Sequence, residues 1–342
     1  MEIQQDRKYR AYIGDIGEDP GSNLQKGLEF MHWDRYIDRH TRVFVKPNFT
    51  FPYYREGVTT TPELLRHLLK ILTSKAGKVT LGESDGGNNS FKVEDAFKGH
   101  NMYQISEETG VELVNLSNLP SEKIESKVAG KKIKVNLPRI LLEETDCFIS
   151  VPALKVHVIT TVSLSLKNSW GCIPDTMRCL QHQNLDYKLA LIAQILKPKI
   201  VVIDGTYALN KHGPMFGDPV KANLVLLADN SLLADSMGAT VMGFSPRDLK
   251  HLAVAEQAGI GSLDLMDAEI NRDWRPYQRH FEVRKTMIDR LSSILFYSDA
   301  LAKLVIDSPI TPAIYKVAGM LRSPEEKDVA GQMTKQRKFG PY

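Results

Sequence analysis

The chain contains 342 residues, of which 42% are hydrophobic, 25% charged and 8% aromatic. These proportions are typical of soluble globular proteins and exclude a disordered, collagen-like or membrane-embedded chain. The net charge of +3 is too small for a general nucleic-acid-binding protein, so no nucleic-acid partner is expected. The length allows one large α/β domain or two smaller ones.

The three cysteines, Cys147, Cys172 and Cys179, are scattered and form no CxxC pair. They cannot supply four thiolates, so we expect no iron–sulfur cluster with a complete in-chain cysteine set, and the cofactor is otherwise unknown. The amino-terminal residues lack the apolar core of a secretory signal. The apolar stretch 287–306 is interrupted by four charged residues. We therefore expect a cytoplasmic protein with no transmembrane segment.

The first 117 residues alternate short β-rich segments with longer helical ones, which is typical of βαβ units on a mostly parallel sheet. Strands are expected at 9–16, 42–47, 78–83 and 111–116, and helices at 23–37, 62–75 and 93–109. The segment SEKIESKVAGKKIKVN, residues 121–136, alternates polar and apolar residues around Ala129-Gly130 and predicts an antiparallel hairpin.

The alternation of strands and helices then resumes. Strands are expected at 147–151, 200–204 and 222–229, and helices at 138–144, 160–168, 187–196, 231–242 and 246–258. We predict an α/β core domain over residues 1–270, with a mostly parallel sheet, helices on both faces and the hairpin as an insert. Residues 271–322 are predicted to form an amphipathic helical appendage, which packs on the core or mediates a homo-oligomer. Residues 323–342 are predicted to be a mobile tail.

Polar residues follow two of the predicted strands at their carboxyl ends, where parallel α/β sheets bind ligands. Lys46 and Asn48 end the first strand, and Glu83, Ser84 and Asp85 follow the second in a glycine-rich loop. We interpret Lys46, Asn48 and Ser84 as candidate substrate-binding residues. Glu83 and Asp85 are candidate ligands of a divalent cation, and the loop could alternatively hold phosphate through its backbone N–H groups.

A second group of polar residues follows the strand predicted at 147–151. In PALKVH, Lys155 and His157 are two residues apart and share a face if the chain stays extended. Ten residues further on, SLSLKN places Lys167 and Asn168 after an apolar run. We interpret His157 as an acid–base residue, Lys155 as a second catalytic residue, and Lys167 and Asn168 as substrate-binding residues.

The strand IVVIDG places Asp204 at a further strand end, and the loop KHGPMFGDP follows it. Asp204 is a third catalytic candidate, as a general base, with a metal ligand and a loop cap as open alternatives. Gly213 and Pro214 are candidate substrate-binding positions, because glycine and proline fix a loop whose backbone can approach a ligand closely.

The motifs VKPN, LGES, PALKVH, SLKN, IDG, GPMFGDP and LADNSLLADSMGATVMGFSPRD together resemble the family called domain of unknown function 362, in matching order over about residues 40–262. Members of this family often carry a ferredoxin-like segment with clustered cysteines, which implies electron-transfer chemistry in that branch. This chain has no such segment, so the resemblance implies redox chemistry only with an external electron source. The positions that match the family pattern are Lys46, Asn48, Ser84, Lys155, His157, Lys167, Asn168, Asp204, Gly213 and Pro214.

These observations predict an enzyme that acts on a small anionic metabolite, a carboxylate or a phosphate. Its anion would be held by Lys46, Lys155 and Lys167, and His157 would transfer protons, because clustered ammonium groups favour a neutral imidazole. A redox protein with a bound or external donor is one alternative. A non-catalytic anion-binding or assembly protein is another.

Overall fold

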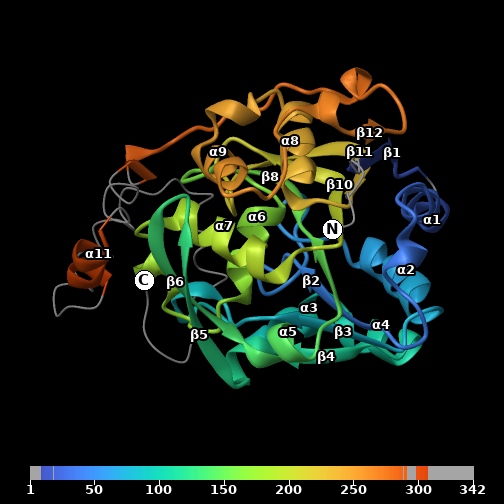
Figure 1. Cartoon of the computed structure of the whole chain (residues 1–342), viewed down its shortest axis with the longest axis horizontal. Coiled ribbons are helices and arrows are strands. Elements are labelled where there is room, and N and C mark those ends of the chain that lie inside the picture. Colours follow the sequence, from blue (N-terminus) through green and yellow to red (C-terminus); the bar gives the residue numbers. More distant parts are fainter. Residues whose placement is uncertain (1–8, 18, 288, 291–297, 307–342) are drawn as a thin grey trace, which may run out of the picture.

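The computed structural model describes residues 9–17, 19–287, 289–290 and 298–306 (Figure 1). Its main sheet has the strand order β12-β1-β11-β10-β7-β2-β3-β4, with β8 beside β10 and β9 beside β8. The strands are β1 (Arg10–Asp15), β2 (Arg42–Pro47), β3 (Lys78–Glu83), β4 (Glu112–Asn115), β7 (Cys147–Val151), β8 (Ala153–His157), β9 (Thr161–Ser163), β10 (Ile200–Asn210), β11 (Asp218–Ala228) and β12 (Glu269–Ile270).

The sheet is mostly parallel, as expected. Strands β10, β7, β2, β3 and β4 are neighbours and run parallel, so their carboxyl ends lie at one edge of the sheet. Strand β11 runs antiparallel between β10 and β1. The parallel part of the sheet therefore contains the strands that carry most of the candidate site residues.

Helices cover both faces of the sheet, as expected. One face packs against α1 (Pro20–Phe30), α2 (Pro62–Thr73), α3 (Val93–Gly99) and α4 (Met102–Thr109), and the other against α5 (Arg139–Glu143), α6 (Ser165–Asn168), α7 (Leu185–Leu196), α8 (Ser231–Val241) and α9 (Lys250–Gln257) (Figure 1). Side chains alternate along β2: Val43 and Val45 face the first group of helices, and Phe44 faces the second. This alternation follows from the pleat of a strand that is buried on both faces.

The predicted hairpin is confirmed, with strands β5 (Ser121–Val128) and β6 (Lys131–Pro138). Ala129 and Gly130 occupy its turn with positive φ values of 43° and 81°. A two-residue turn of this kind matches the twist of the flanking strands, and glycine accepts the left-handed conformation without strain.

Several predicted helices are wrong in part, among them those at 160–168 and 93–109. The segment 160–168 contains the short strand β9, which pairs with β8, and only Ser165–Asn168 is helical. β-branched residues favour the extended conformation there, and Thr161 has a φ of 66° that ends any helix. The segment 93–109 is divided into α3 and α4, because Asn101 adopts a left-handed conformation between them.

The region after residue 267 contacts the core at several points. Strand β12 pairs with β1, and the Asn271 side chain accepts from the Ile13 N–H at 2.8 Å and donates to its carbonyl at 3.0 Å. Phe281 is buried in the core, and α11 (Asp299–Ile306) packs against the 3₁₀ turn Arg178–Gln181. The proposed tail, 323–342, lies outside the described residues, and the division into core and appendage stays a prediction.

None of the helices in the described part of the chain has the length and apolar character needed to cross a membrane.

Candidate functional site

Lys46 and Glu83 form a buried ion pair at the carboxyl ends of the adjacent strands β2 and β3. Lys46 Nζ lies 2.5 Å from Glu83 Oε2 and also donates to the Pro47 carbonyl at 2.7 Å. The Glu83 carboxylate accepts in addition from the backbone N–H groups of Phe49 and Ser84. Both charges are therefore matched by the protein itself.

Gly171 lies directly against this pair. A Cβ atom at this position would lie 2.8 Å from Glu83 Oε1 and 2.9 Å from Lys46 Nζ. Only a residue without a side chain fits so close an approach of the backbone to two buried charged groups.

Lys155, on β8, is fully buried, and its ammonium donates to three uncharged acceptors. These are Asn48 Oδ1 at 2.8 Å, Thr50 Oγ1 at 2.8 Å and the Val58 carbonyl at 2.7 Å. The three N–H groups of a lysine are thereby all used. Burial, followed by the nearby charge of Lys167, holds the pKa of Lys155 well below its usual value.

Two asparagines connect this region to α6. Asn48 Nδ2 donates to Asn168 Oδ1 at 3.2 Å. Asn168 Nδ2 in turn donates to the Lys46 carbonyl at 3.1 Å and to Ser150 Oγ at 3.2 Å. The strand ends that carry Lys46, Asn48 and Lys155 are thus joined with α6 in one buried network.

Lys167, on α6, differs from the two other lysines of the site. Within the described residues, its Nζ has no hydrogen-bond acceptor and no carboxylate in contact. Burial, with the nearby guanidinium of Arg178, lowers the pKa of Lys167 to about 7. Within the part of the chain that the structure describes, the Arg178 side chain donates to the backbone carbonyls of Asp175 and Asp85.

The charge of Lys167 acts on three buried or partly buried histidines. Burial, and next the charge of Lys167, hold the pKa of His157 well below its usual value and lower that of His182 to about 3. The same two causes lower the pKa of His251, on α9, to about 3. His157 Nδ1 accepts from the Ile159 N–H at 3.0 Å, so the neutral ring carries its proton on Nε2.

The acidic residues proposed as metal ligands are engaged by protein donors. Asp85 accepts from Lys92 Nζ at 2.6 Å, from the Val93 N–H at 3.0 Å and from Asn115 Nδ2 at 3.0 Å. In the described part of the chain, no three His, Cys, Asp or Glu residues are grouped so that they could hold a metal ion. Glu83 and Asp85 are thus both anchored by protein donors, and the divalent-cation site stays a prediction.

Ser84, the hydroxyl between these two carboxylates, is buried, and its Oγ has no hydrogen-bond partner among the described residues. It lies beside the loop that Arg178 binds through the Asp85 carbonyl, at 2.9 Å. It therefore remains a candidate for contact with a ligand.

Asp204 and the loop after it contact neighbouring segments of the chain near the site. Asp204 Oδ2 accepts from the Thr61 N–H at 2.6 Å, and Oδ1 accepts from the N–H and hydroxyl of Thr206. Gly213 packs on β8, where a Cβ would meet the Val156 carbonyl at 1.8 Å, and it precedes Pro214. Asp204 therefore fits the loop-capping alternative, while Gly213 and Pro214 lie beside the strand that carries His157.

Sequence reasoning missed Arg178, His182 and His251. Arg178 and His182 belong to an irregular segment after Pro174, and His251 lies on a helix 69 positions or more further along the chain. Since none of them follows a strand of the sheet, the strand-end pattern gives no signal for them. The clustering of basic residues in RCLQH is the one local feature that could have drawn attention to this segment.

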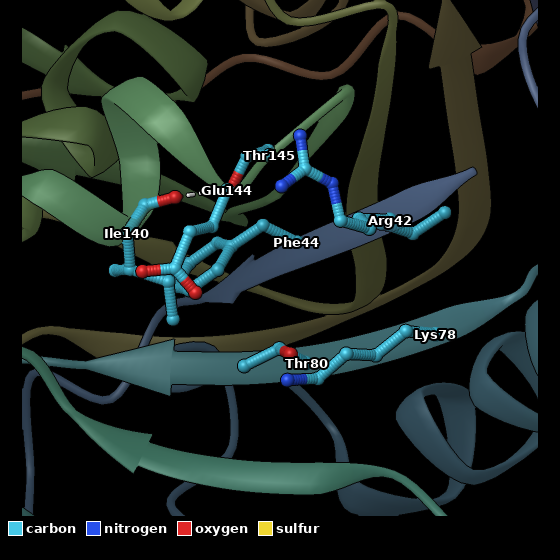
Figure 2. A pocket seen from close by; sticks show the side chains of 8 residues that line it. Arg42, Phe44, Lys78, Thr80, Ile140, Glu144 and Thr145 are labelled. Atoms are coloured by element: carbon cyan, nitrogen blue, oxygen red, sulfur yellow. Dashed lines mark hydrogen bonds between the residues drawn. The ribbon is translucent and has the colours of Figure 1, made fainter. Parts of the chain in front are cut away.

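A small cavity lies at the opposite edge of the sheet (Figure 2). It has a volume of about 30 Å³ and is lined by residues that include Arg42 and Lys78, the first residues of β2 and β3. A cavity of this volume has room for about one water molecule. This cavity is therefore separate from the candidate site, which lies where the same strands end.

The fold and the site together define an α/β protein with a lysine- and histidine-rich centre at the carboxyl ends of a mostly parallel sheet. Residues 43–240 match the model of the family described as "Domain of unknown function (DUF362)", which covers more than half of the chain. The chain therefore belongs to this family, as the motifs predicted. The matched region contains every candidate residue predicted from the sequence.

The proteins that are similar to the chain include one from a cyanobacterium and one from a thermophilic bacterium. The thylakoid-associated protein sll1697 of Synechocystis sp. is 24% identical over 237 residues, which cover 66% of this chain and 70% of that protein. A crystal structure of a protein from Thermotoga maritima aligns with a TM-score of 0.32 at 14% identity. That alignment covers 54% of this chain and 50% of the Thermotoga chain, so the chain matches about half the length of that protein.

Proposed function

We propose that this protein is an enzyme that binds a small anionic metabolite, a carboxylate or a phosphate, at Lys167 and Arg178. The observation that supports this proposal is the pair of neighbouring cations, neither of which contacts a carboxylate within the described residues. Two partly buried like charges repel each other, and an anion between them removes the repulsion.

The other two lysines have a different role in this proposal. Lys46 is neutralised by Glu83, and all three N–H groups of Lys155 are held by protein acceptors. They position Asn48, Asn168 and α6, and with them Lys167. The substrate-binding role predicted for Lys46 is thus replaced, in our proposal, by a positioning role.

His157 is the proposed acid–base residue. Its neutral ring has one nitrogen occupied by the Ile159 N–H and the other protonated. It can therefore donate a proton from Nε2 and take one back, which is the task of a general acid–base residue. We expect the His157→Gln variant to bind anions as the wild type does and to lose about 10² to 10⁴ in turnover.

Thermal unfolding in the presence of phosphate, sulfate or oxalate tests the binding step, with sodium chloride of equal ionic strength as the reference. Each anion should raise the melting temperature by mass action, since stabilisation grows as RT ln(1 + [L]/Kd). The Lys167→Met and Arg178→Met variants should each weaken this response. Lys78→Met, a change at the opposite edge of the sheet, should keep it; equal responses in all four proteins would contradict the proposal.

A screen of carboxylate and phosphate metabolites by mass spectrometry tests the enzymatic part. We expect the wild type to convert one of these metabolites and the His157→Gln variant to lose this conversion. Anion binding without conversion would instead identify a carrier or assembly protein. Visible absorbance of the purified protein would identify a redox protein.

We further propose that the protein acts in the cytoplasm and that its C-terminal helices mediate a homo-oligomer. The Synechocystis relative is a thylakoid-associated protein. Cell fractionation distinguishes a cytoplasmic from a membrane-associated location, and light scattering of the whole chain gives its mass in solution.

A further inference from the structure

Lys167 is held in place from both ends of α6. At the start of the helix, the buried carboxylate of Asp235 accepts from the backbone N–H groups of Ser165 and Leu166, at 2.7 and 2.9 Å. At its end, Asn168 binds the Lys46 carbonyl and Ser150. The lysine between these two anchors is therefore fixed in its backbone, although its own Nζ has no acceptor within the described residues.

The charged and titratable groups near Lys167 do not stabilise the positive charge of its ammonium group. Arg178 on the neighbouring 3₁₀ turn, and Lys155 and His157 on β8, are basic, as are the two other histidines of the site, His182 and His251. The carboxylate of Asp235, which lies at the start of α6, is used by two backbone N–H groups. A lysine in such surroundings is readily present as an uncharged amine, which is a nucleophile.

From this arrangement, and resting on the proposed function, we infer that Lys167 forms a covalent imine with the carbonyl group of an anionic aldehyde or ketone. The carboxylate or phosphate of that substrate pairs with Arg178, whose guanidinium stays charged when the lysine is neutral. The substrate class is thereby narrowed to small oxo acids and phosphorylated carbonyl compounds.

The proposed step is balanced without an oxidant or reductant. The Nζ lone pair attacks the carbonyl carbon to form a C–N bond, and the carbonyl oxygen takes up a proton to give a carbinolamine. The nitrogen then loses its second hydrogen and the carbon loses its hydroxyl group, so one water molecule leaves and a C=N bond remains. The neutral imidazole of His157 is suited to deliver and take back the protons involved.

Reductive trapping of the full chain with glyoxylate and cyanoborohydride at pH 7 tests the inference. Peptide mapping by mass spectrometry should show the reduced adduct mainly on Lys167. The rate of labelling at Lys167 should level off above about pH 7, because its pKa is about 7, whereas the rate at exposed lysines should keep rising towards their usual pKa. Phosphate should slow the labelling of Lys167 by competing for Arg178.

The Lys167→Arg variant separates this inference from the proposed function. It keeps a positive charge and so should keep a melting-temperature response to phosphate, but an arginine forms no imine and the adduct should be lost. A phosphate response of the wild type without preferential labelling of Lys167 by glyoxylate would overturn the imine alone. Absence of any phosphate response in the wild type would overturn anion binding, and labelling of Lys155 in place of Lys167 would overturn the assignment of the nucleophile.

Discussion

At the scale of single residues, the structure separates three lysines that look alike in the sequence, two of them buried and Lys167 partly buried. Lys46 has a carboxylate partner, Lys155 has three neutral acceptors, and Lys167 has no acceptor among the described residues. Substitution of Lys46 should therefore reduce stability the most, because the loss of one member of a buried ion pair leaves the other charge without compensation.

The Lys46–Glu83 pair provides the first prediction. Glu83→Gln and Lys46→Met should each reduce the free energy of unfolding by about 3 to 5 kcal/mol, as expected when one partner of a buried pair is removed. Urea denaturation at pH 7 measures this change. Lys78→Met breaks an exposed ion pair with Glu112 and should cost no more than about 1 kcal/mol; a similar cost for the buried and exposed pairs would contradict the assignment.

A second prediction concerns the pH dependence that Lys167 imposes. Its pKa is about 7 in the folded protein and near the usual value of about 10.4 in the unfolded chain, which therefore binds more protons between these two pH values. The contribution of Lys167 to stability thus rises as the pH increases from 7 to 10.

Denaturation curves measured at pH 7 and pH 9.5 check this sign. Lys167→Met should unfold with a smaller gain in stability over this range than the wild type, and Lys78→Met with the same gain. The gain in stability of Lys167→Met between pH 7 and pH 9.5 should not vanish entirely, since Lys155, whose pKa is also lowered, contributes in the same direction. If the wild type and Lys167→Met gained equally, the lowered pKa of Lys167 would be refuted.

At the scale of the elements, hydrophobic periodicity and strand-end polarity predicted most of the fold. The boundaries of β2, β3 and β7 were predicted to the residue, because each is a short apolar run with clear turn signals on both sides. The strand β9 was missed, since three residues are too few for a periodic pattern and their pairing with β8 is a tertiary contact.

The site was predicted only in part, and the reason lies in the distances along the chain. Lys155 meets acceptors 97 to 107 positions away, and no local pattern reveals that these use all of its N–H groups. The strand-end rule identified Lys46 and Lys155, and the apolar run before it identified Lys167, but neither pattern could show which lysine has no partner among the described residues. Arg178 and the two histidines of the site beyond His157 required the three-dimensional structure.

The anchoring of α6 by Asp235 provides a third prediction, at the scale of an element. Burial raises the pKa of Asp235 to about 7, so at pH 6 the side chain is mostly neutral and still accepts from the two N–H groups. Asp235→Ala leaves both groups without an acceptor, at about 1 to 3 kcal/mol for each. Asp235→Asn keeps one acceptor, so its stability should lie between those of the alanine variant and the wild type.

Urea denaturation at pH 6 gives this order directly. Asp264→Ala is a suitable control, because Asp264 caps an exposed 3₁₀ turn by accepting from the Met266 N–H at 2.9 Å, and its loss should cost about 1 kcal/mol. An Asp235→Ala variant as stable as the control would show that α6 does not depend on this carboxylate.

At the scale of the whole molecule, buried histidines determine the response to acid. Burial lowers the pKa of His100 to about 4, and burial also lowers the pKa values of His157, His182 and His251. In the unfolded chain these groups titrate near the usual value of about 6.5. Their contribution to stability is therefore fully present above pH 6.5 and is lost as the pH falls towards 4.

This fourth prediction is checked by the unfolding free energy measured at several pH values between 7 and 4. The wild type should become steadily less stable on acidification, and His251→Gln should lose less over the same range. The exposed His40 is the matched control, and His40→Gln should follow the wild type. Identical acid profiles for His251→Gln and the wild type would contradict this account.

The attachment of the C-terminal region provides the fifth prediction. A chain truncated after Asp267 loses β12, the Asn271 bonds to Ile13 and the buried Phe281, so it should unfold at a lower temperature than the full chain or aggregate. A chain truncated after Arg290 keeps all three and should melt cooperatively. Phe281→Ala alone should cost about 3 to 5 kcal/mol; equal melting of both truncated chains would show instead that residues from Asn271 onward are dispensable.

Strand β1 lies between β11 and β12, so the first strand of the described chain obtains both of its neighbours from residues more than 200 positions later. During synthesis on the ribosome, its two edges stay unpaired until β11, and then β12, has emerged, when residues 228 and 270 of 342 have been made. Pairings between such distant parts of a sequence close slowly, and an unpaired apolar strand is prone to associate with other chains in the meantime. Chaperones that bind extended apolar segments are therefore expected to retain the nascent protein until β11 is made, and yield on overexpression should improve when the rate of translation is lowered.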